Sequence, residues 1–342
     1  MSNQRSIAQA LCLNQTTVSL ALRGHPRIPE ETRQLVLDEA ERQGYRSNAY
    51  VSTLMQHIRS GRSIRDKICI AILADAKSLD DWLTNQVYVE QYNNIQMQAE
   101  KLGFYTECFF LRAAGMSPRR IDGILQARGI NGLILGAPYR KTTPFSGLDW
   151  KSYACVGNGL SWQNCPADLV VNNHLKNVEI AWEVLRSRGY RRIGLCLPLE
   201  QFQKEVRTYW AHGYIGCQLF SSQMESLPIM RGNPEEVPFA QFKEWYERWK
   251  PDALLCPTEH EMKWIRALGL RVPEDIAIAC LATTTDESFS GVIEDSAMMG
   301  TTLVDLVAGK IIHNEYGRLT TPKVTLVTGH WREGKTVRPA TS

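Results

Sequence analysis

From Lys67 to the end of the chain, short apolar runs alternate with stretches that have the periodicity of amphipathic helices. The apolar runs are residues 67–73, 105–111, 131–136, 153–159, 191–197, 253–257, 276–282 and 324–329. The helical stretches are 86–103, 117–129, 173–188, 204–222, 239–249, 260–268 and 296–313. Strands that alternate with helices form right-handed crossover units and parallel sheets covered on both faces. Because the runs outnumber the strands of one six-stranded sheet, we predict two doubly wound lobes that face a cleft, with ligands bound beyond the carboxyl ends of the strands.

The start of the chain has a different pattern, which predicts three short helices between Asn3 and Gly44. Asn3 and Asn14 can cap the first two helices, and Pro29 can open the third. Only Cys12-Leu13 links the first two helices, which is too short for anything but a tight helix-turn-helix. The expected apolar faces are Ile7, Ala8 and Leu11 in the first helix, Val18, Ala21 and Leu22 in the second, and Leu35, Val36 and Ala40 in the third.

Residues 46–62 form a polar linker with one apolar side. Asn48 can cap a short helix there, and Val51, Leu54, Met55 and Ile58 are spaced along one side of it. A helix this short is marginal in isolation, so we expect it to fold only when something holds it. The predicted domains are a headpiece (1–46), a hinge helix and linker (47–64) and a two-lobed body (65–342).

Charge is unevenly distributed along the chain. Residues 1–65 contain nine arginines, no lysine and five acidic residues, whereas the whole chain has a net charge of only +3. A basic end on a near-neutral body favours a polyanionic partner for that end, although a solvated basic face is the plain alternative. No apolar run is long enough to span a bilayer, and the start lacks the apolar core of a signal peptide, so we expect a cytoplasmic protein without a membrane partner.

Nine scattered cysteines without a C-x-x-C pair predict reduced, mostly buried thiols and neither a disulfide framework nor a zinc site. Glu259-His260-Glu261 lacks the second histidine of H-E-x-x-H, so we expect a surface or lobe-packing role for it. Gly157-Asn158-Gly159 has neither the P-loop lysine nor the G-x-G-x-x-G spacing. We identify no catalytic constellation, metal site or cofactor site, and we predict that the protein is not an enzyme.

An ordered set of motifs along the whole chain resembles the lactose-repressor (LacI) family of bacterial transcription regulators. In the headpiece the motifs are Thr17-Val18-Ser19, Glu30-Glu31-Thr32-Arg33 and Tyr45. In the body they are Arg191–Gly194, Val272–Ile278, Asp295 with Met299 and Gly300, and Gly329 with Trp331 and Gly334.

This resemblance implies an all-α helix-turn-helix headpiece that enters the major groove and a hinge helix in the minor groove. It implies an α/β body, similar to periplasmic sugar-binding proteins, that forms a homodimer and senses a small molecule. We therefore expect a repressor that binds a pseudo-palindromic operator in double-stranded DNA and associates with the bacterial nucleoid when bound.

The expected DNA contacts lie in the second helix and the hinge. Gln15 can pair bidentately with an adenine edge, Leu20 can contact a thymine methyl, and Leu54 occupies the position of the family's minor-groove wedge. The predicted DNA-binding residues are Asn14, Gln15, Thr16, Thr17, Ser19, Leu20, Arg27, Asn48, Leu54 and Met55.

The predicted effector is small, neutral and sugar-like, because aromatic faces pack on the apolar face of a pyranose. The predicted contacts are Trp82, Trp162, Asn172, Asn173, Arg207 and Trp210. Trp210 replaces the family's usual arginine, and Cys280-Leu281-Ala282 replaces its Gly-Phe-Asp, so the usual effector cannot be carried over. In the hinge, Ser47, Val51, Ser52 and Met55 depart from the family pattern.

Three alternatives stay open. A solute-binding protein without a DNA role would explain the two-lobed body but not the headpiece. A sugar-modifying enzyme would need a carboxylate pair or metal ligands in the cleft. A regulator that senses no effector would explain the lost polar positions.

Overall fold

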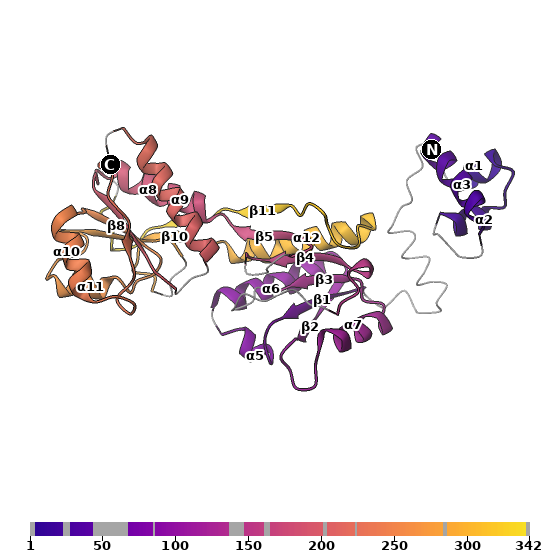
Figure 1. Ribbon diagram of the computed structural model, residues 1–342, viewed down its shortest axis with the longest axis horizontal. Helices are drawn as coiled ribbons and strands as arrows, with labels where there is room; N and C mark the ends of the chain where they lie inside the picture. The colour runs from indigo at the N-terminus through magenta and orange to yellow at the C-terminus, as the bar shows by residue number, and fades with distance from the viewer. Residues whose placement is uncertain are drawn as a thin grey trace. The chain divides into compact units, whose positions relative to one another are not determined.

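A computed structural model shows two compact units, Met1–Asp66 and Lys67–Ser342, and each is described by itself (Figure 1). The structure describes residues 4–22, 28–43, 68–84, 86–136, 147–160, 165–200, 204–222, 224–282 and 286–339. The predicted hinge helix lies outside these residues. Within the described residues, no helix is long and apolar enough to cross a membrane.

The first unit contains three helices, α1 (Gln4–Ala10), α2 (Gln15–Ala21) and α3 (Glu30–Arg42). Ile7, Val18 and Val36, one from each helix, are fully buried against one another. The turn between α1 and α2 is tight because Cys12 adopts a left-handed φ of 53°, and the N–H of Leu13 donates to the carbonyl of Ala8. The expectation that Leu35 faces this core is wrong, since Leu35 is 58% exposed.

The first lobe of the second unit is built on a six-stranded sheet with the order β11-β5-β4-β3-β1-β2. Its strands are β1 (Ile68–Ala74), β2 (Phe104–Phe110), β3 (Gly132–Leu135), β4 (Ala154–Asn158), β5 (Asp168–Asn172) and β11 (Val324–Val327). Its helices are α5 (Leu79–Trp82), α6 (Gln86–Lys101), α7 (Pro118–Ala127), α12 (Ser296–His313) and the short 3-10 helix η1 (Trp150–Ser152). All five pairings between neighbouring strands are parallel.

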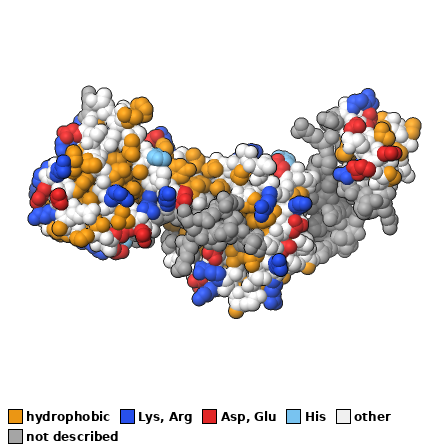
Figure 2. Space-filling view, viewed as in Figure 1, with side chains coloured by type: hydrophobic (Ala, Val, Ile, Leu, Met, Phe, Trp, Pro, Cys, Tyr) orange, Lys and Arg blue, Asp and Glu red, His pale blue; other side chains and the backbone are white. Residues whose placement is uncertain are grey.

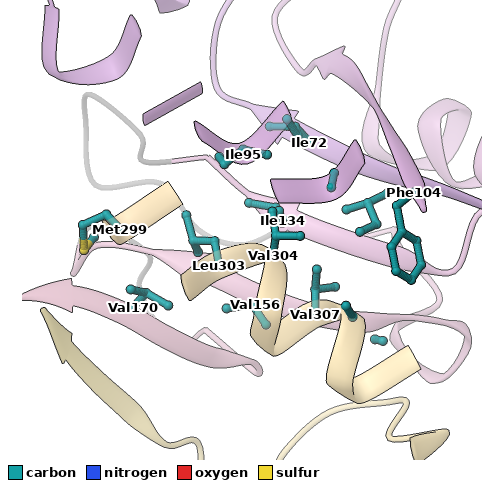
Figure 3. Close-up of a cluster of buried hydrophobic side chains, with 14 of the residues drawn as sticks. Ile72, Ile95, Phe104, Ile134, Val156, Val170, Met299, Leu303, Val304 and Val307 are labelled. Atoms are coloured by element: carbon teal, nitrogen blue, oxygen red, sulfur yellow. The ribbon is translucent and has the colours of Figure 1, made fainter. Parts of the chain in front are cut away.

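Side chains on the first sheet alternate between two buried faces, as expected for a parallel sheet covered on both sides. Ile70 and Ile72 of β1 pack on the face covered by α6 and α12, whereas Ala71 and Leu73 pack on the face covered by α7. Figure 3 shows the first of these cores, where Leu303, Val304 and Val307 of α12 meet strand side chains. Although α12 comes late in the sequence, it therefore belongs to the first lobe.

The second lobe has a six-stranded sheet with the order β12-β10-β9-β8-β6-β7. Its strands are β6 (Ile193–Leu197), β7 (Met230–Arg231), β8 (Ala253–Cys256), β9 (Ala277–Cys280), β10 (Gly291–Ile293) and β12 (His330–Arg332). Its helices are α8 (His174–Ser187), α9 (Lys204–Phe220), α10 (Phe239–Trp249) and α11 (Met262–Ala267). Trp182 and Tyr214 pack on the face covered by α8 and α9, and Phe242 and Trp264 pack on the opposite face.

The predicted two doubly wound, parallel-sheet lobes are confirmed for the body. The edge strand β12 departs from the parallel pattern, because it pairs antiparallel with β10. The sequence patterns did not identify β5, β7, β10 or β12, and the last three contain only two or three residues each. The chain passes between the lobes three times, after β5, between β10 and α12, and between β11 and β12.

Candidate effector-binding site

Each sheet has a topological switch point where ligands bind in open α/β folds. In the first sheet, the chain goes from β1 to β2 on one side and to β3 on the other. In the second sheet, it goes from β6 to β7 on one side and to β8 on the other. The carboxyl ends of β1 and β3, and of β6 and β8, therefore define the candidate site.

At the first switch point, Trp82 packs over the end of β3. A Cβ added to Gly136, directly after β3, would lie 2.7 Å from Cζ2 of Trp82, so a larger residue would displace the ring. Trp82 is only 2% exposed and makes an edge-to-face contact with Tyr92 at 5.8 Å. Directly after β1, Oδ1 of Asp75 lies 3.2 Å from Nε of Arg112, which fixes a charged pair at the carboxyl end of this strand.

At the second switch point, a carboxylate holds two loops together. The Glu236 carboxylate accepts hydrogen bonds from the N–H groups of Leu199 at 2.6 Å and Glu200 at 2.8 Å, which ties the segment after β7 to the segment after β6. Glu261, at the start of α11, is 1% exposed. Burial, reinforced by the negative charges of Glu259 and Glu236, raises the pKa of Glu261 to about 8. Its carboxyl group is therefore largely protonated at neutral pH.

A buried histidine and a largely buried glutamate meet at the passages between the lobes. Nδ1 of His174, in the first turn of α8, lies 3.3 Å from Oε1 of Glu294, which follows β10. Their geometry is not that of a hydrogen bond, although the distance is that of an ion pair. Burial lowers the pKa of His174 to about 4 and raises the pKa of Glu294 to about 7. Both shifts favour the uncharged forms, so the pair holds less charge than an exposed pair would.

The first turn of α8 also connects to the third passage between the lobes. Nδ2 of Asn173 donates to Oγ1 of Thr328 at 3.2 Å, and Oδ1 of Asn177 accepts from the N–H of Gly329 at 3.0 Å. A Cβ at Gly329 would lie 2.5 Å from the carbonyl oxygen of Ile293, so only glycine permits this approach. All three passages are therefore tied together at the start of α8.

The predicted effector residues lie near these passages and strand ends, but with different exposures. Trp210 is fully buried and contacts His174 edge-to-face at 5.7 Å. Asn172 ends β5, half-buried, and its Oδ1 has no hydrogen-bond partner among the described residues. Arg207 donates to the carbonyl of Pro198, after β6, at 3.2 Å. Trp162 lies outside the described residues. Contact of these residues with an effector stays a prediction.

Four residues at the site were not predicted, namely His174, Glu236, Glu261 and Glu294. The Glu259–Glu261 segment was noticed, but a surface or packing role was expected for it. Glu261 is buried, and no group of three His, Cys, Asp or Glu side chains suited to a metal ion occurs among the described residues. The only available signal was position, because each residue lies close after a strand or at the start of a helix.

The predicted DNA-contacting residues of α2 differ in exposure. Asn14, Gln15 and Thr16 are exposed, and Oδ1 of Asn14 caps the helix by accepting from the N–H of Thr16 at 3.0 Å. Thr17 and Leu20 are half-buried, whereas Ser19 is 8% exposed. Arg27, Asn48, Leu54 and Met55 lie outside the described residues.

Comparison with known proteins agrees with this architecture. Residues 182–337 match the family profile of the periplasmic binding protein-like domain. The fold is also that of solved transcription regulators. The complex of the transcriptional regulator CelR with cellobiose superposes with a TM-score of 0.57 at 18% identity, over 98% of this chain and all of the other. No curated protein sequence matches significantly.

Two further solved structures share the fold. The lac repressor dimer bound to operator and the anti-inducer ONPF has a TM-score of 0.54 at 16% identity, over 98% of each chain. A periplasmic binding protein/LacI transcriptional regulator from Alkaliphilus metalliredigens, complexed with D-xylulofuranose, has a TM-score of 0.55 at 12% identity, over 79% of this chain and 99% of the other. The predicted resemblance to the LacI family is thus confirmed at the level of the fold.

Proposed function

We propose that this protein is a transcription regulator that binds operator DNA through its first unit and a small molecule through its second. The observation that carries the proposal is the order of parts along the chain. A three-helix unit, whose second helix exposes Asn14, Gln15 and Thr16, precedes a body with two ligand-binding switch points. A solute-binding protein or an enzyme would need the second part alone.

The DNA-binding part of the proposal rests on a helix-turn-helix of α1 and α2, with α2 in the major groove. Polar side chains at the start of such a helix reach base edges, and arginines neutralise phosphates. The hinge segment then reaches the minor groove with Leu54 as a wedge. The protein acts in the bacterial cytoplasm, mainly as a repressor, and has no catalytic role.

Homodimer formation is part of the same proposal, because a pseudo-palindromic operator mirrors a twofold axis. Large exposed apolar side chains on the body support self-association. Met97 on α6 is 60% exposed, and Leu219 and Phe220 at the end of α9 are 74% and 86% exposed. Figure 2 shows hydrophobic side chains gathered in patches on the visible face of the second lobe.

The effector part of the proposal rests on the two switch points and the passages between the lobes. A sugar-like molecule held at these strand ends would favour one arrangement of the lobes. A hundredfold difference in its affinity for two arrangements corresponds to about 2.7 kcal/mol of coupling to DNA binding. Trp82, Trp162, Asn172, Asn173, Arg207 and Trp210 remain the proposed contacts.

The test is a duplex-binding assay with the full chain, after selection of its preferred site from random DNA. Affinity should fall by roughly 10³ between 50 and 200 mM salt if about six phosphates are contacted. Operator titration with compounds that raise the melting temperature then tests the effector. Affinity independent of salt would contradict DNA binding, and compounds that shift melting but never operator affinity would leave a regulator without effector control.

A further inference from the structure

A groove runs between α10 and β7, the edge strand of the second sheet. β7 pairs with β6 on one side and has no neighbouring strand on the other. The groove has a volume of about 330 Å³, which suits one small molecule. Arg231, the last residue of β7, lines one wall. The other wall is one face of α10, formed at positions i, i+3, i+4, i+7 and i+8 by Gln241, Glu244, Trp245, Arg248 and Trp249.

The two tryptophans of the groove are held in place by the rest of the lobe. Nε1 of Trp245 donates to the carbonyl of Pro228, just before β7, at 3.0 Å. A Cβ added to Gly194 of β6 would lie 2.6 Å from Cη2 of Trp245, so this ring lies directly on the sheet. The end of α10 is fixed by Arg192, whose Nε donates to the carbonyl of Trp249 at 3.1 Å. Both indoles are therefore positioned, half-buried apolar surfaces.

Two arginines of the groove have no carboxylate partner. Within the described residues, neither Arg231 nor Arg248 forms an ion pair. Glu244 lies four residues before Arg248, a spacing that favours such a pair, but the Arg248 guanidinium lies 5.3 Å from the centroid of the Trp249 ring instead. The main chain of Arg231 is held by Gln241, whose Nε2 donates to its carbonyl at 3.4 Å. Both arginine side chains are exposed, so two positive charges are available to a ligand.

The chemistry of the lining favours an anion attached to a ring. A phosphate monoester has a charge of about −1.5 to −2 at pH 7, which matches two guanidinium groups. The planar fork of a guanidinium donates two parallel hydrogen bonds to such an anion. Indole faces pack against sugar rings and nucleobases. The Glu244 carboxylate and the Gln241 amide are suited to hydrogen bonds with ring hydroxyl groups.

We propose that this groove binds a small phosphate ester of a hydroxylated ring, with the phosphate on Arg231 and Arg248 and the ring against Trp245 and Trp249. Sugar phosphates and mononucleotides share this chemistry. The ligand is additional to the proposed effector, because the groove contains none of the six residues proposed to contact the effector. The second lobe thus has a second ligand site along its open edge.

The experiment compares phosphate esters with the corresponding neutral compounds on the full-length protein. The pairs are glucose 6-phosphate with glucose, fructose 6-phosphate with fructose, AMP with adenosine, and UMP with uridine. Inorganic phosphate alone measures the anion without a ring. Calorimetry at about 150 mM salt screens weak binding to scattered surface charges. At least one ester should bind at least about tenfold more tightly than both its neutral partner and inorganic phosphate, and the sugar and nucleotide pairs identify the ring.

Variants then locate the site. Arg231→Gln and Arg248→Gln should each weaken the preferred ester at least about tenfold, because each removes a charged donor. Trp249→Leu should weaken the ester but leave inorganic phosphate unchanged, because it removes only the surface that contacts the ring. Arg266→Gln is the matched control, because it makes the same charge change at an exposed position on α11, outside the groove. Thermal melts of each variant verify that the body is folded.

Three results overturn the inference. The first is the absence of any preference for an ester over its neutral partner in all four pairs. The second is unchanged ester affinity in both Arg231→Gln and Arg248→Gln, which would place the phosphate elsewhere, such as on the basic headpiece. The third is equal affinity for the esters and for inorganic phosphate, which would exclude a contact between the ring and the indoles. None of these measurements uses DNA, so the outcome is independent of the proposed operator binding.

Discussion

The buried pair His174 and Glu294 predicts two opposite pH dependences of stability that cancel in the native protein. Burial holds the pKa of His174 near 4, below its usual 6.5, so the unfolded chain binds more protons between these values and stability rises with pH there. Burial holds the pKa of Glu294 near 7, above its usual 4.5, so the folded chain binds more protons and stability falls as pH rises from 4.5 to 7. Each slope changes the free energy of unfolding by about 3 kcal/mol over its pH range.

Single substitutions should separate the two slopes. Glu294→Gln removes the falling slope. Its free energy of unfolding, relative to that of the native protein, should therefore rise by about 3 kcal/mol as the pH increases from 4.5 to 7. His174→Gln removes the rising slope. Its free energy of unfolding, relative to that of the native protein, should therefore fall by a similar amount as the pH increases from 4 to 6.5. Urea unfolding followed by tryptophan fluorescence at half-unit pH steps measures both.

A matched control exists in the same chain, since His313 and Glu315 lie 3.9 Å apart but are 69% and 53% exposed. His313→Gln should change the pH dependence little, because solvent screens an exposed pair. The reasoning is refuted if the signs are reversed. In that case His174 and Glu294 form a charged ion pair whose attraction exceeds the effect of burial.

The other predictions concern DNA and the passage between the lobes. Gln15→Ala should cost about 1 to 3 kcal/mol on the best operator and relax one base position, and unchanged site preference in a binding selection would remove Gln15 from base readout. Leu54→Ala should keep the dimer but lose the operator bend reported by end-labelled fluorescent duplexes, because a methyl group cannot hold a base step apart; an unchanged bend rejects the wedge. Gly329→Ala should destabilise the body by roughly 1 to 3 kcal/mol through its clash with the carbonyl of Ile293, whereas Gly309→Ala, with open space around its Cβ, should be neutral or stabilising in thermal melts. Equal melting temperatures for the two glycine variants would contradict the close approach.

The sequence predicted the body well where helices and strands have strong local patterns. The bounds of α6, α10 and α12 follow from apolar periodicity, and β1 follows from a continuous apolar run. Short edge strands such as β7 and β12 carry no such pattern, because few of their side chains need to be buried. Leu35 shows the same limit within a helix, since periodicity allowed two adjacent residues to face the core and packing buried only Val36.

The sequence by itself determined the alternation of strands and helices, the cap of α2 at Asn14 and the family motifs, because hydrophobic periodicity and capping act over a few residues. The tertiary structure decided that α12 returns to the first lobe and that β12 joins the second sheet. It also decided that His174 meets Glu294, and that Glu261 is buried. These residues come from separate segments of the chain, and their burial depends on how the sheets pack. The resulting pKa shifts are properties of that packing, and no local pattern encodes them.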